Sequence, residues 1–338
     1  MSQIGLSRIP FIDTAKGLCI MLVVLYHINT YYDIPEIGIV ASFHMPLFFL
    51  LSGCFYKSYG SFKLFCTKKT NQLLIPFFFF YLTISVALPN LLSVFGYSVR
   101  NENGIGIRSL LNFIVDNNWP NSPIWFLLCL YMINLLFYFF EHISRGDKRI
   151  IACLSVICGI VGYVLSYLSL NIYMYIDSAL TGLFFFWLGN MMYTQTSLVK
   201  SKQKIISLLF VVLVGLLCIV FWGHDIGWSG NNGLASYPLY EVYITAILGS
   251  FSLIAFSKLF YRWLPCFTYW GKYSLIILCT HNSILQVLNI ITTKFQLSVW
   301  LSVVLILVVT MMLYYFIVPL LIRIIPWFVN QKPLLKEK

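Results

Sequence analysis

The sequence predicts an all-α fold, a polytopic integral membrane protein with about ten transmembrane helices, from its composition, its long apolar runs and the charges between them. Of its 338 residues, 60% are hydrophobic and only 10% are charged, which is typical of a chain that lies in lipid. The apolar runs are long enough to cross a hydrocarbon core of about 30 Å, which takes about 20 helical residues. They lack the alternating polar pattern of a membrane β-barrel, so each run is predicted to be a helix that satisfies its own backbone groups.

Each predicted helix is bounded by a loop whose charges or turn residues interrupt the apolar run. In order, the predicted segments are 11–31, 40–57, 72–95, 123–142, 150–170, 176–195, 204–223, 238–257, 268–293 and 297–325. Lys and Arg gather before the first segment, in the even-numbered loops and after the last segment: Arg8, Lys57, Lys63, Lys68, Lys69, Arg145, Lys148, Arg149, Lys200, Lys202, Lys204, Lys258, Arg262, Lys332, Lys336 and Lys338. The odd-numbered loops carry acids or balanced charges, among them Asp33, Glu36, Asp177 and Asp225. Because Lys and Arg accumulate on the cytoplasmic side, both termini are predicted to be cytoplasmic.

The net charge of +11 is therefore mostly an orientation signal, and no basic soluble module is expected to bind nucleic acid. The first apolar run is too long for a signal peptide and leads into no small-residue cleavage site. The nine cysteines form no Cys-x-x-Cys pair, and no His-x-x-x-His occurs at ligand spacing, so neither a disulfide framework nor a metal site or other bound cofactor is expected. With no fixed-period repeat and no linker, residues 1–338 are predicted to form a single membrane domain.

The first predicted helix carries ionisable residues within its apolar run. Lys16 and His27 are eleven residues apart, almost a whole number of turns, so both side chains would lie on one face, roughly 16 Å apart along the axis. Asp13, three residues before Lys16, shares that face. Ionisable groups are costly inside a bilayer, so this line of them indicates a functional pathway. The alternative is a snorkelling lysine and a solitary polar packing residue.

Two more of the five histidines fall within predicted helices. His44 lies near the outer end of the second helix, within reach of the depth of His27, and His281 lies near the middle of the ninth. A neutral imidazole can be buried and can take or give a proton near neutral pH, as a general base within a membrane requires. The alternative for His44 and His281 is a hydrogen bond between helices.

Two groups of polar residues suggest binding surfaces, one on each side of the membrane. Candidates for holding phosphates at the inner side are Arg8, Lys16, Lys68, Lys69 and Lys272, although the positive-inside rule alone explains bases in loops. At the outer side, Trp119 and Trp125 in a segment rich in Asn, Gly and Pro suit a sugar, although aromatic belts at membrane interfaces are routine. Glu241 begins the eighth segment and suits a polar substrate or the start of a helix equally.

Four stretches of the chain resemble the acyltransferase family 3 integral-membrane O-acyltransferases, and within them the fucose 4-O-acetylase-like branch. The stretch from Arg8 through Asp13 and Lys16 to His27 is similar to the family's Arg/Lys-x10-His signature, and the stretch from Phe43-His44 to Ser52-Gly53 is similar to its Phe-Phe-x-x-Ser-Gly. The other two stretches are Pro123-Ile124-Trp125-Phe126-Leu127 and Gly271-Lys272-Tyr273-Ser274-Leu275 leading to His281. The predicted number of helices agrees as well, and the resemblance covers nearly the whole chain.

The resemblance implies transfer of an acyl group, usually acetyl, from acetyl-CoA as a cytoplasmic co-substrate to a hydroxyl of a surface polysaccharide, such as capsule or O-antigen, or of its lipid-linked precursor. The expected location is the bacterial cytoplasmic (inner) membrane, in a stand-alone form without a fused extracytoplasmic domain. The expected catalytic residues are His27, Lys16 and Asp13. The expected contacts to the acyl donor are Arg8, Lys68, Lys69, Lys272, Ser52 and Gly53, and those to the acceptor are His44, Trp119, Trp125, Glu241 and His281.

Two points about this chemistry stay open from the sequence. His27 would act either as a general base on the acceptor hydroxyl or as the group that briefly accepts the acyl chain. Lys16 stands where the family more often has Arg, and lysine lacks the planar fork that binds a phosphate or carboxylate at two points. Two other functions would also fit many helices: a transporter or flippase, for which no matching repeat or broken helix pair is visible, and a membrane scaffold, which would not require Lys16 and His27 in line.

Overall fold

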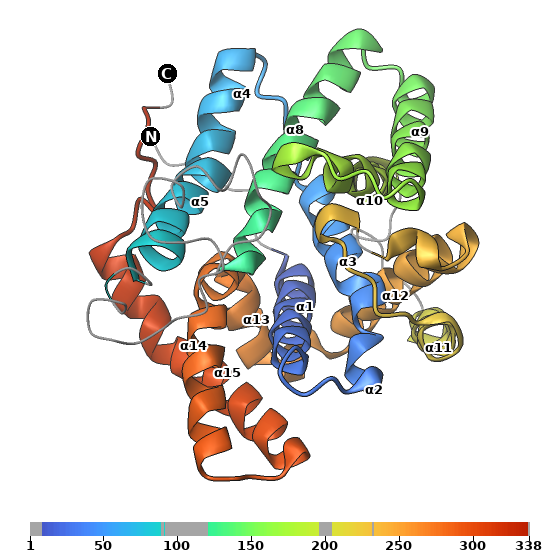
Figure 1. Cartoon of the computed structure of the whole chain (residues 1–338). Coiled ribbons are helices and arrows are strands. Elements are labelled where there is room, and N and C mark those ends of the chain that lie inside the picture. Colours follow the sequence, from blue (N-terminus) through green and yellow to red (C-terminus); the bar gives the residue numbers. More distant parts are fainter. Residues whose placement is uncertain (1–8, 89–90, 92–120, 196–204, 232, 337–338) are drawn as a thin grey trace.

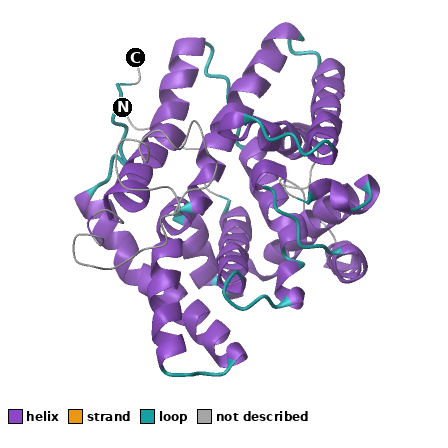
Figure 2. Cartoon of the chain, viewed as in Figure 1, coloured by secondary structure: helices purple, strands orange, loops and turns teal. Residues whose placement is uncertain are grey.

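A computed structural model describes residues 9–88, 91, 121–195, 205–231 and 233–336, and in these residues all regular structure is helical (Figure 2). This confirms the predicted fold class. The helices are α1 (Pro10–Asn29), α2 (Pro35–Gly38), α3 (Ala41–Cys54), α4 (Phe62–Lys69), α5 (Ile75–Phe80), α8 (Trp125–Ile143), α9 (Lys148–Tyr167), α10 (Ile176–Gln195), α11 (Ile205–Trp222), α12 (Leu239–Phe260), α13 (Pro265–Lys272), α14 (Ser274–Lys294) and α15 (Val299–Ile324). Short π segments flank α5, η1 (Thr70–Leu74) and η2 (Tyr81–Ala87), and the 3₁₀ turns are η3 (Ser122–Ile124), η4 (Tyr173–Tyr175), η5 (Ser229–Asn231), η6 (Leu234–Ser236) and η7 (Tyr261–Trp263).

Within this part of the chain, nine helical stretches are long and apolar enough to cross a membrane, and they match nine of the ten predicted segments. The third of them, Phe62–Ala87, begins ahead of the predicted start at residue 72 because α4 runs without a break through η1, α5 and η2. The remaining predicted segment, the sixth (176–195), forms α10 but is not among the nine, since polar residues such as Asp177 and Asn190 dilute its apolar run. The protein is therefore a multi-pass membrane protein. The cytoplasmic placement of both termini stays a prediction.

The first helix lies in the middle of the molecule. Figure 1 shows α1 between α3 on one side and α13 and α14 on the other, and α1 also contacts α12 and α15. Buried residues occur on every side of α1, as expected for a helix that is apolar all round. By contrast, α9 and α11 lie at the periphery and expose large apolar side chains such as Ile157 and Phe210. These outer faces are suited to lipid, whereas the polar residues of α1 face other helices.

The ninth predicted segment, 268–293, is not one continuous helix, and in this respect the prediction was wrong. The chain leaves helical geometry at Tyr273 (φ −115°, ψ 22°), so α13 ends at Lys272 and α14 begins at Ser274. The reason is packing. A Cβ on Gly271 would overlap the carbonyl oxygen of Asp13, and one on Gly17 would overlap that of Phe267, so α13 and α1 are in direct backbone contact at both glycines. After this contact the chain continues as α14.

Candidate active site

Three histidines predicted from separate segments gather around the C-terminal half of α1. The ring of His27, on α1, lies 5.1 Å from the ring of His281, on α14. The ring of Tyr26 lies 5.8 Å from His27 and 5.3 Å from His44, which α3 contributes. His44 and His281 are buried, and His27 is half-buried. We call His27, His44, His281 and Tyr26 the histidine cluster.

Two imidazoles of the cluster have their orientation fixed by backbone carbonyls. His44 Nδ1 lies 2.9 Å from the carbonyl oxygen of Val40, and His281 Nδ1 lies 2.8 Å from that of Ile277. A carbonyl oxygen can only accept a hydrogen bond, so Nδ1 carries the proton in both rings. In a neutral ring Nε2 is then an acceptor, and the buried Nε2 of His281 has no hydrogen-bond partner among the described residues. The cluster thus contains a basic nitrogen that the fold leaves free for another molecule or for His27.

A constant register between two parallel elements brings His27 and His281 together. Thr14 and Thr268, which are 254 positions apart, share a hydrogen bond of 2.8 Å between their hydroxyls. Gly17 and Gly271 have the same separation and meet at the backbone contact, and His27 and His281 have it again. Three contacts with one offset show that α1 and the pair α13 and α14 run in the same direction and in step.

The predicted donor-binding residues separate into two groups in the structure. Lys16 Nζ lies 5.0 Å from the centre of the Phe55 ring, just after the inner end of α3. Tyr56 follows Phe55 in the chain. Lys69 is buried, and its Nζ lies 5.9 Å from the centre of the Tyr56 ring. Lys68 lies over the ring of Tyr59, at 4.2 Å. Lys16, Lys68 and Lys69 therefore all approach the segment that follows α3.

The second group surrounds a separate hollow at the start of α1. Asp13 and Lys272 line it together with Thr268 and Tyr269, and its volume is about 410 Å³. Lys272 is exposed and lies 5.0 Å from the ring of Tyr273. The hollow is formed by the first turns of α1, by α13 and by Tyr261 before it, and neither Lys16 nor Phe55 lines it.

Other predicted residues lie outside the histidine cluster. A Cβ on Gly53 would overlap the carbonyl oxygen of Phe186, so Gly53 permits close packing of α3 on α10, and Ser52 is half-buried beside it. Trp125 is buried at the start of α8, 5.3 Å from the ring of Tyr175. Arg8 and Trp119 lie outside the described residues.

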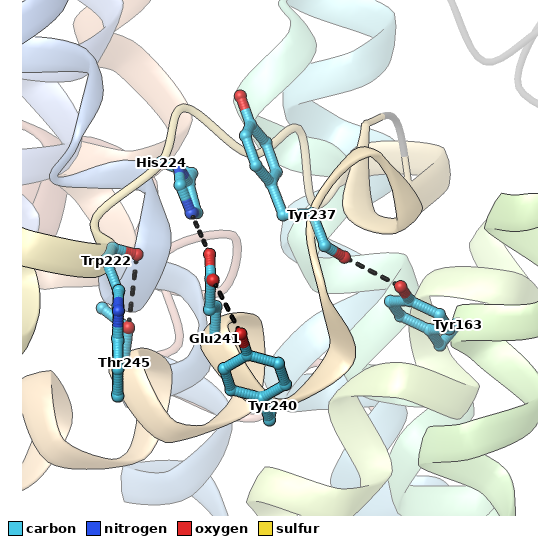
Figure 3. A network of polar contacts seen from close by, with 7 residues as sticks. All are labelled: Tyr163, Trp222, His224, Tyr237, Tyr240, Glu241 and Thr245. Carbon is cyan, nitrogen blue, oxygen red and sulfur yellow. Dashed lines mark hydrogen bonds and ion pairs between the residues drawn. The ribbon is translucent and has the colours of Figure 1, made fainter.

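Glu241 belongs to a polar network at the outer end of α12 (Figure 3). Its Oε2 lies 2.9 Å from His224 Nε2, and its Oε1 accepts a hydrogen bond of 3.1 Å from the Tyr240 hydroxyl. The His224 ring stacks on that of Tyr237 at 3.7 Å. These contacts hold the loop after α11 at the outer end of α12.

Sequence reasoning missed Tyr26, which belongs to the histidine cluster, and Asp225, which contacts it. It also missed a signal in the sequence for the register of α1 with α13 and α14. Tyr26 is a neighbour of His27 in sequence, and its hydroxyl donates a hydrogen bond of 2.9 Å to Asp225, which had been treated only as a loop charge. The register was visible as a shared pattern: Thr14, Gly17 and His27 have the same spacing as Thr268, Gly271 and His281. No such signal marks Asp225, because its contact depends on the path of a loop. No group of three or more His, Cys, Asp or Glu side chains within the described residues is arranged to hold a metal ion.

The central helix α1 and its neighbours α3 and α14 bring three histidines together inside a polytopic membrane protein. Such an arrangement is suited to group transfer within the membrane. The chain belongs to the acyltransferase family that its motifs resemble: the family model described as "Acyltransferase domain" matches residues 9–323. The protein is thus a multi-pass membrane member of that family. It is similar to Nodulation protein NolL of Sinorhizobium fredii (strain NBRC 101917 / NGR234), with 27% identity over 238 residues that cover 65% of this chain and 59% of that relative. The match therefore spans less than two thirds of the relative, and no solved structure matches the chain.

Proposed function

We propose that this protein transfers an acetyl group from cytoplasmic acetyl-CoA to a hydroxyl of a surface polysaccharide or of its lipid-linked precursor, at the inner membrane of a bacterium. The observation that carries the proposal is the pairing of His27 with His281 at a ring distance of 5.1 Å on the central helix that also bears Lys16. Acyl transfer to an alcohol needs a group that takes the hydroxyl proton, and a positioned neutral imidazole is suited to that task.

In the first of two possible mechanisms, His27 is a general base. Its ring accepts the proton of the acceptor hydroxyl while the oxygen attacks the thioester carbonyl carbon, so that the new C–O bond forms and the C–S bond breaks. The departing thiolate then takes a proton from the imidazolium, which yields the ester and free CoA. The unpartnered Nε2 of His281 supports this mechanism, because it can accept a hydrogen bond from His27 and hold that ring in one orientation.

In the second mechanism, His27 attacks the thioester itself and becomes acylated, and the acceptor hydroxyl then attacks the acyl-imidazole. The first step forms the N–C bond, breaks the C–S bond and releases the thiolate. In the second step the C–O bond forms and the N–C bond breaks while His281 Nε2 takes the proton of the acceptor hydroxyl, and this proton then passes to the thiolate to give free CoA. Both mechanisms need the same neighbours. They differ in one measurable respect, because only the second yields labelled protein when acetyl-CoA is supplied without acceptor.

On the donor side we assign the phosphates of acetyl-CoA to Lys16, Lys68 and Lys69, which gather at the segment after α3, with Ser52 nearby. CoA is too large and charged to cross lipid, so its acyl-bearing arm would enter from the cytoplasm along α1 toward His27. Along a helix, the eleven residues from Lys16 to His27 span roughly 16 Å. On the acceptor side, His44, Trp125 and Glu241 are the candidates for sugar contacts within the described residues.

The test is an acetyl-transfer assay on purified protein in detergent or nanodiscs, with radiolabelled acetyl-CoA and with or without the glycan fraction of the host. We expect labelled glycan from the wild type and none from His27→Ala. The exposed His142, at the end of α8, provides the matched control, and His142→Ala should transfer at the wild-type rate. Transfer by His27→Ala at the wild-type rate would remove His27 from the chemistry.

One observation favours a second function, a transporter or flippase for a glycan or lipid intermediate. Broken helices are common at the binding sites of transporters, and the break between α13 and α14 lies beside the central helix. Proteoliposomes that take up labelled glycolipid without acetyl-CoA, and that make no ester when acetyl-CoA is added, would favour transport. Ester formation that depends on acetyl-CoA favours the enzyme.

A further inference from the structure

The loop after α11 is fastened to the outer ends of α2, α3 and α10. We call residues 223–231 the outer strap. The Trp228 Nε1 donates a hydrogen bond of 2.6 Å to the carbonyl oxygen of Ala41, where α3 begins. The backbone N–H of Gly230 donates one of 2.8 Å to Ser178 Oγ of α10. With His224 paired to Glu241, the outer strap has anchors along its length (Figure 3).

These anchors bring the carboxylate of Asp225 against the first and second helices. Its Oδ1 accepts the hydrogen bond of 2.9 Å from the Tyr26 hydroxyl on α1. Its Oδ2 lies 2.9 Å from the point where a Cβ of Gly38 would be, so the lack of a side chain at Gly38 makes room for the carboxylate. The rest of Asp225 is exposed. An exposed acid thus has one oxygen on Tyr26 and the other against the backbone of α2.

The ring that Asp225 fixes is part of the histidine cluster. Tyr26 lies edge-on to His27, at 5.8 Å, and tilted against His44, at 5.3 Å. A tyrosine held at its hydroxyl loses freedom of its ring, and the His27 imidazole packed on that ring loses freedom with it. His44 and His281 need no such support, because a backbone carbonyl already fixes the Nδ1 of each. Among the described contacts of His27, that with Tyr26 is the one that leads to the outer strap.

We propose that Asp225 is a positioning residue: through its hydrogen bond to Tyr26 it holds His27 in the arrangement that acyl transfer requires. The inference rests on the proposed function and adds to it a residue outside the family motifs. Its physical basis is that small displacements of a reacting group reduce the rate strongly, and the Tyr26 hydroxyl is already engaged by Asp225.

The competing explanation is that Asp225 only helps to fasten the outer strap. The hydrogen bond from the Gly230 backbone N–H to Ser178 Oγ separates the two roles, because it anchors the same strap without touching Tyr26. Ser178→Ala removes that anchor and serves as the matched control. Asp225→Asn keeps an oxygen that can accept the Tyr26 hydrogen bond, whereas Asp225→Ala and Tyr26→Phe each remove it.

The experiment measures kcat and KM for acetyl-CoA and glycan in the wild type and in Tyr26→Phe, Asp225→Ala, Asp225→Asn, Ser178→Ala and the double variant Tyr26→Phe/Asp225→Ala. Thermal unfolding of each purified protein shows that it is folded. We expect kcat to fall about tenfold in Tyr26→Phe and in Asp225→Ala with KM for acetyl-CoA unchanged, and the double variant to be no slower than either single variant. Asp225→Asn should restore most of kcat, and Ser178→Ala should retain it.

Two results would overturn the inference. One is an Asp225→Ala protein with wild-type kcat in a preparation whose His27→Ala counterpart is inactive. The other is a double variant whose loss is the product of the single losses, since Asp225 would then act independently of Tyr26. Failure of the proposed function has a different signature, in which His27→Ala transfers acetyl groups at the wild-type rate.

Discussion

Replacing His281 by leucine tests whether this buried histidine serves packing or chemistry, because the two roles predict different changes in stability. His281 is fully buried in α14, with Nδ1 bonded to the Ile277 carbonyl oxygen at 2.8 Å and Nε2 without a partner among the described residues. A residue kept for stability would not leave a buried nitrogen unpaired. We therefore expect His281→Leu to abolish transfer while unfolding at the wild-type temperature or above it.

The magnitude follows from two opposing terms. Leucine removes the unpaired Nε2, whose burial costs about 1–3 kcal/mol, and it also removes the Nδ1 hydrogen bond, which contributes about 1 kcal/mol. The Ile277 carbonyl keeps its helical hydrogen bond, so no new buried acceptor is left unpaired. Leucine is similar in volume to histidine, so it adds no large cavity or overpacking cost. The free energy of unfolding should therefore rise by about 0–2 kcal/mol.

The assay pairs thermal unfolding in detergent with the rate of acetyl transfer. Asn134→Leu is the matched control, because Asn134 in α8 is also buried, bonds a backbone carbonyl at 2.7 Å through Nδ2 and leaves Oδ1 without a partner among the described residues. Asn134→Leu should give a similar change in stability and keep activity. The reasoning is refuted if His281→Leu unfolds about 3 kcal/mol more easily, or transfers acetyl groups at the wild-type rate.

Three further predictions concern the central helix and its neighbours. Gly271→Ala should destabilise the protein by about 1–3 kcal/mol or more, because the new Cβ meets the Asp13 carbonyl, and a thermal shift within error would contradict this contact. Lys16→Ala should raise KM for acetyl-CoA several-fold while Lys16→Arg keeps it, measured by steady-state kinetics at varied donor; equal KM values in all three proteins would exclude Lys16 from donor binding. One alanine inserted after Leu275 should turn His281 by about 100° and stop transfer, whereas one inserted after Leu285 should not, and the comparison of their rates is the test.

Much of the fold could be predicted from the sequence because lipid imposes one strong constraint. Apolar runs must form helices that span the bilayer, so the existence and approximate bounds of nine of them followed from length and composition. The break at Tyr273 could not be predicted this way. It results from the backbone contact at Gly17 and Gly271, a tertiary event between residues 254 positions apart, and the local sequence around Lys272 is apolar enough for one helix.

The candidate site could be predicted in part, for a related reason. His27, His44 and His281 were identified because ionisable groups in apolar runs are rare, and the structure places their helices around one point. The grouping of the lysines could not be deduced, since positive residues at the inner side look alike in sequence. Only the packing shows that Lys16 and Lys69 approach the segment after α3, whereas Lys272 lines the hollow with Asp13.

The location of α1 explains why a costly set of polar residues persists on one helix. A helix at the edge of the molecule would expose Lys16 and His27 to lipid, where each would cost several kcal/mol. Here a different element covers each polar residue: α14 provides His281 for His27, the outer strap provides Asp225 for Tyr26, α13 provides Thr268 for Thr14, and the end of α3 provides the Phe55 ring for Lys16. Because these partners come from distant parts of the chain, the cluster exists only in the folded protein. Any change that separates α14 or the outer strap from α1 should therefore reduce transfer before it unfolds the remaining helices.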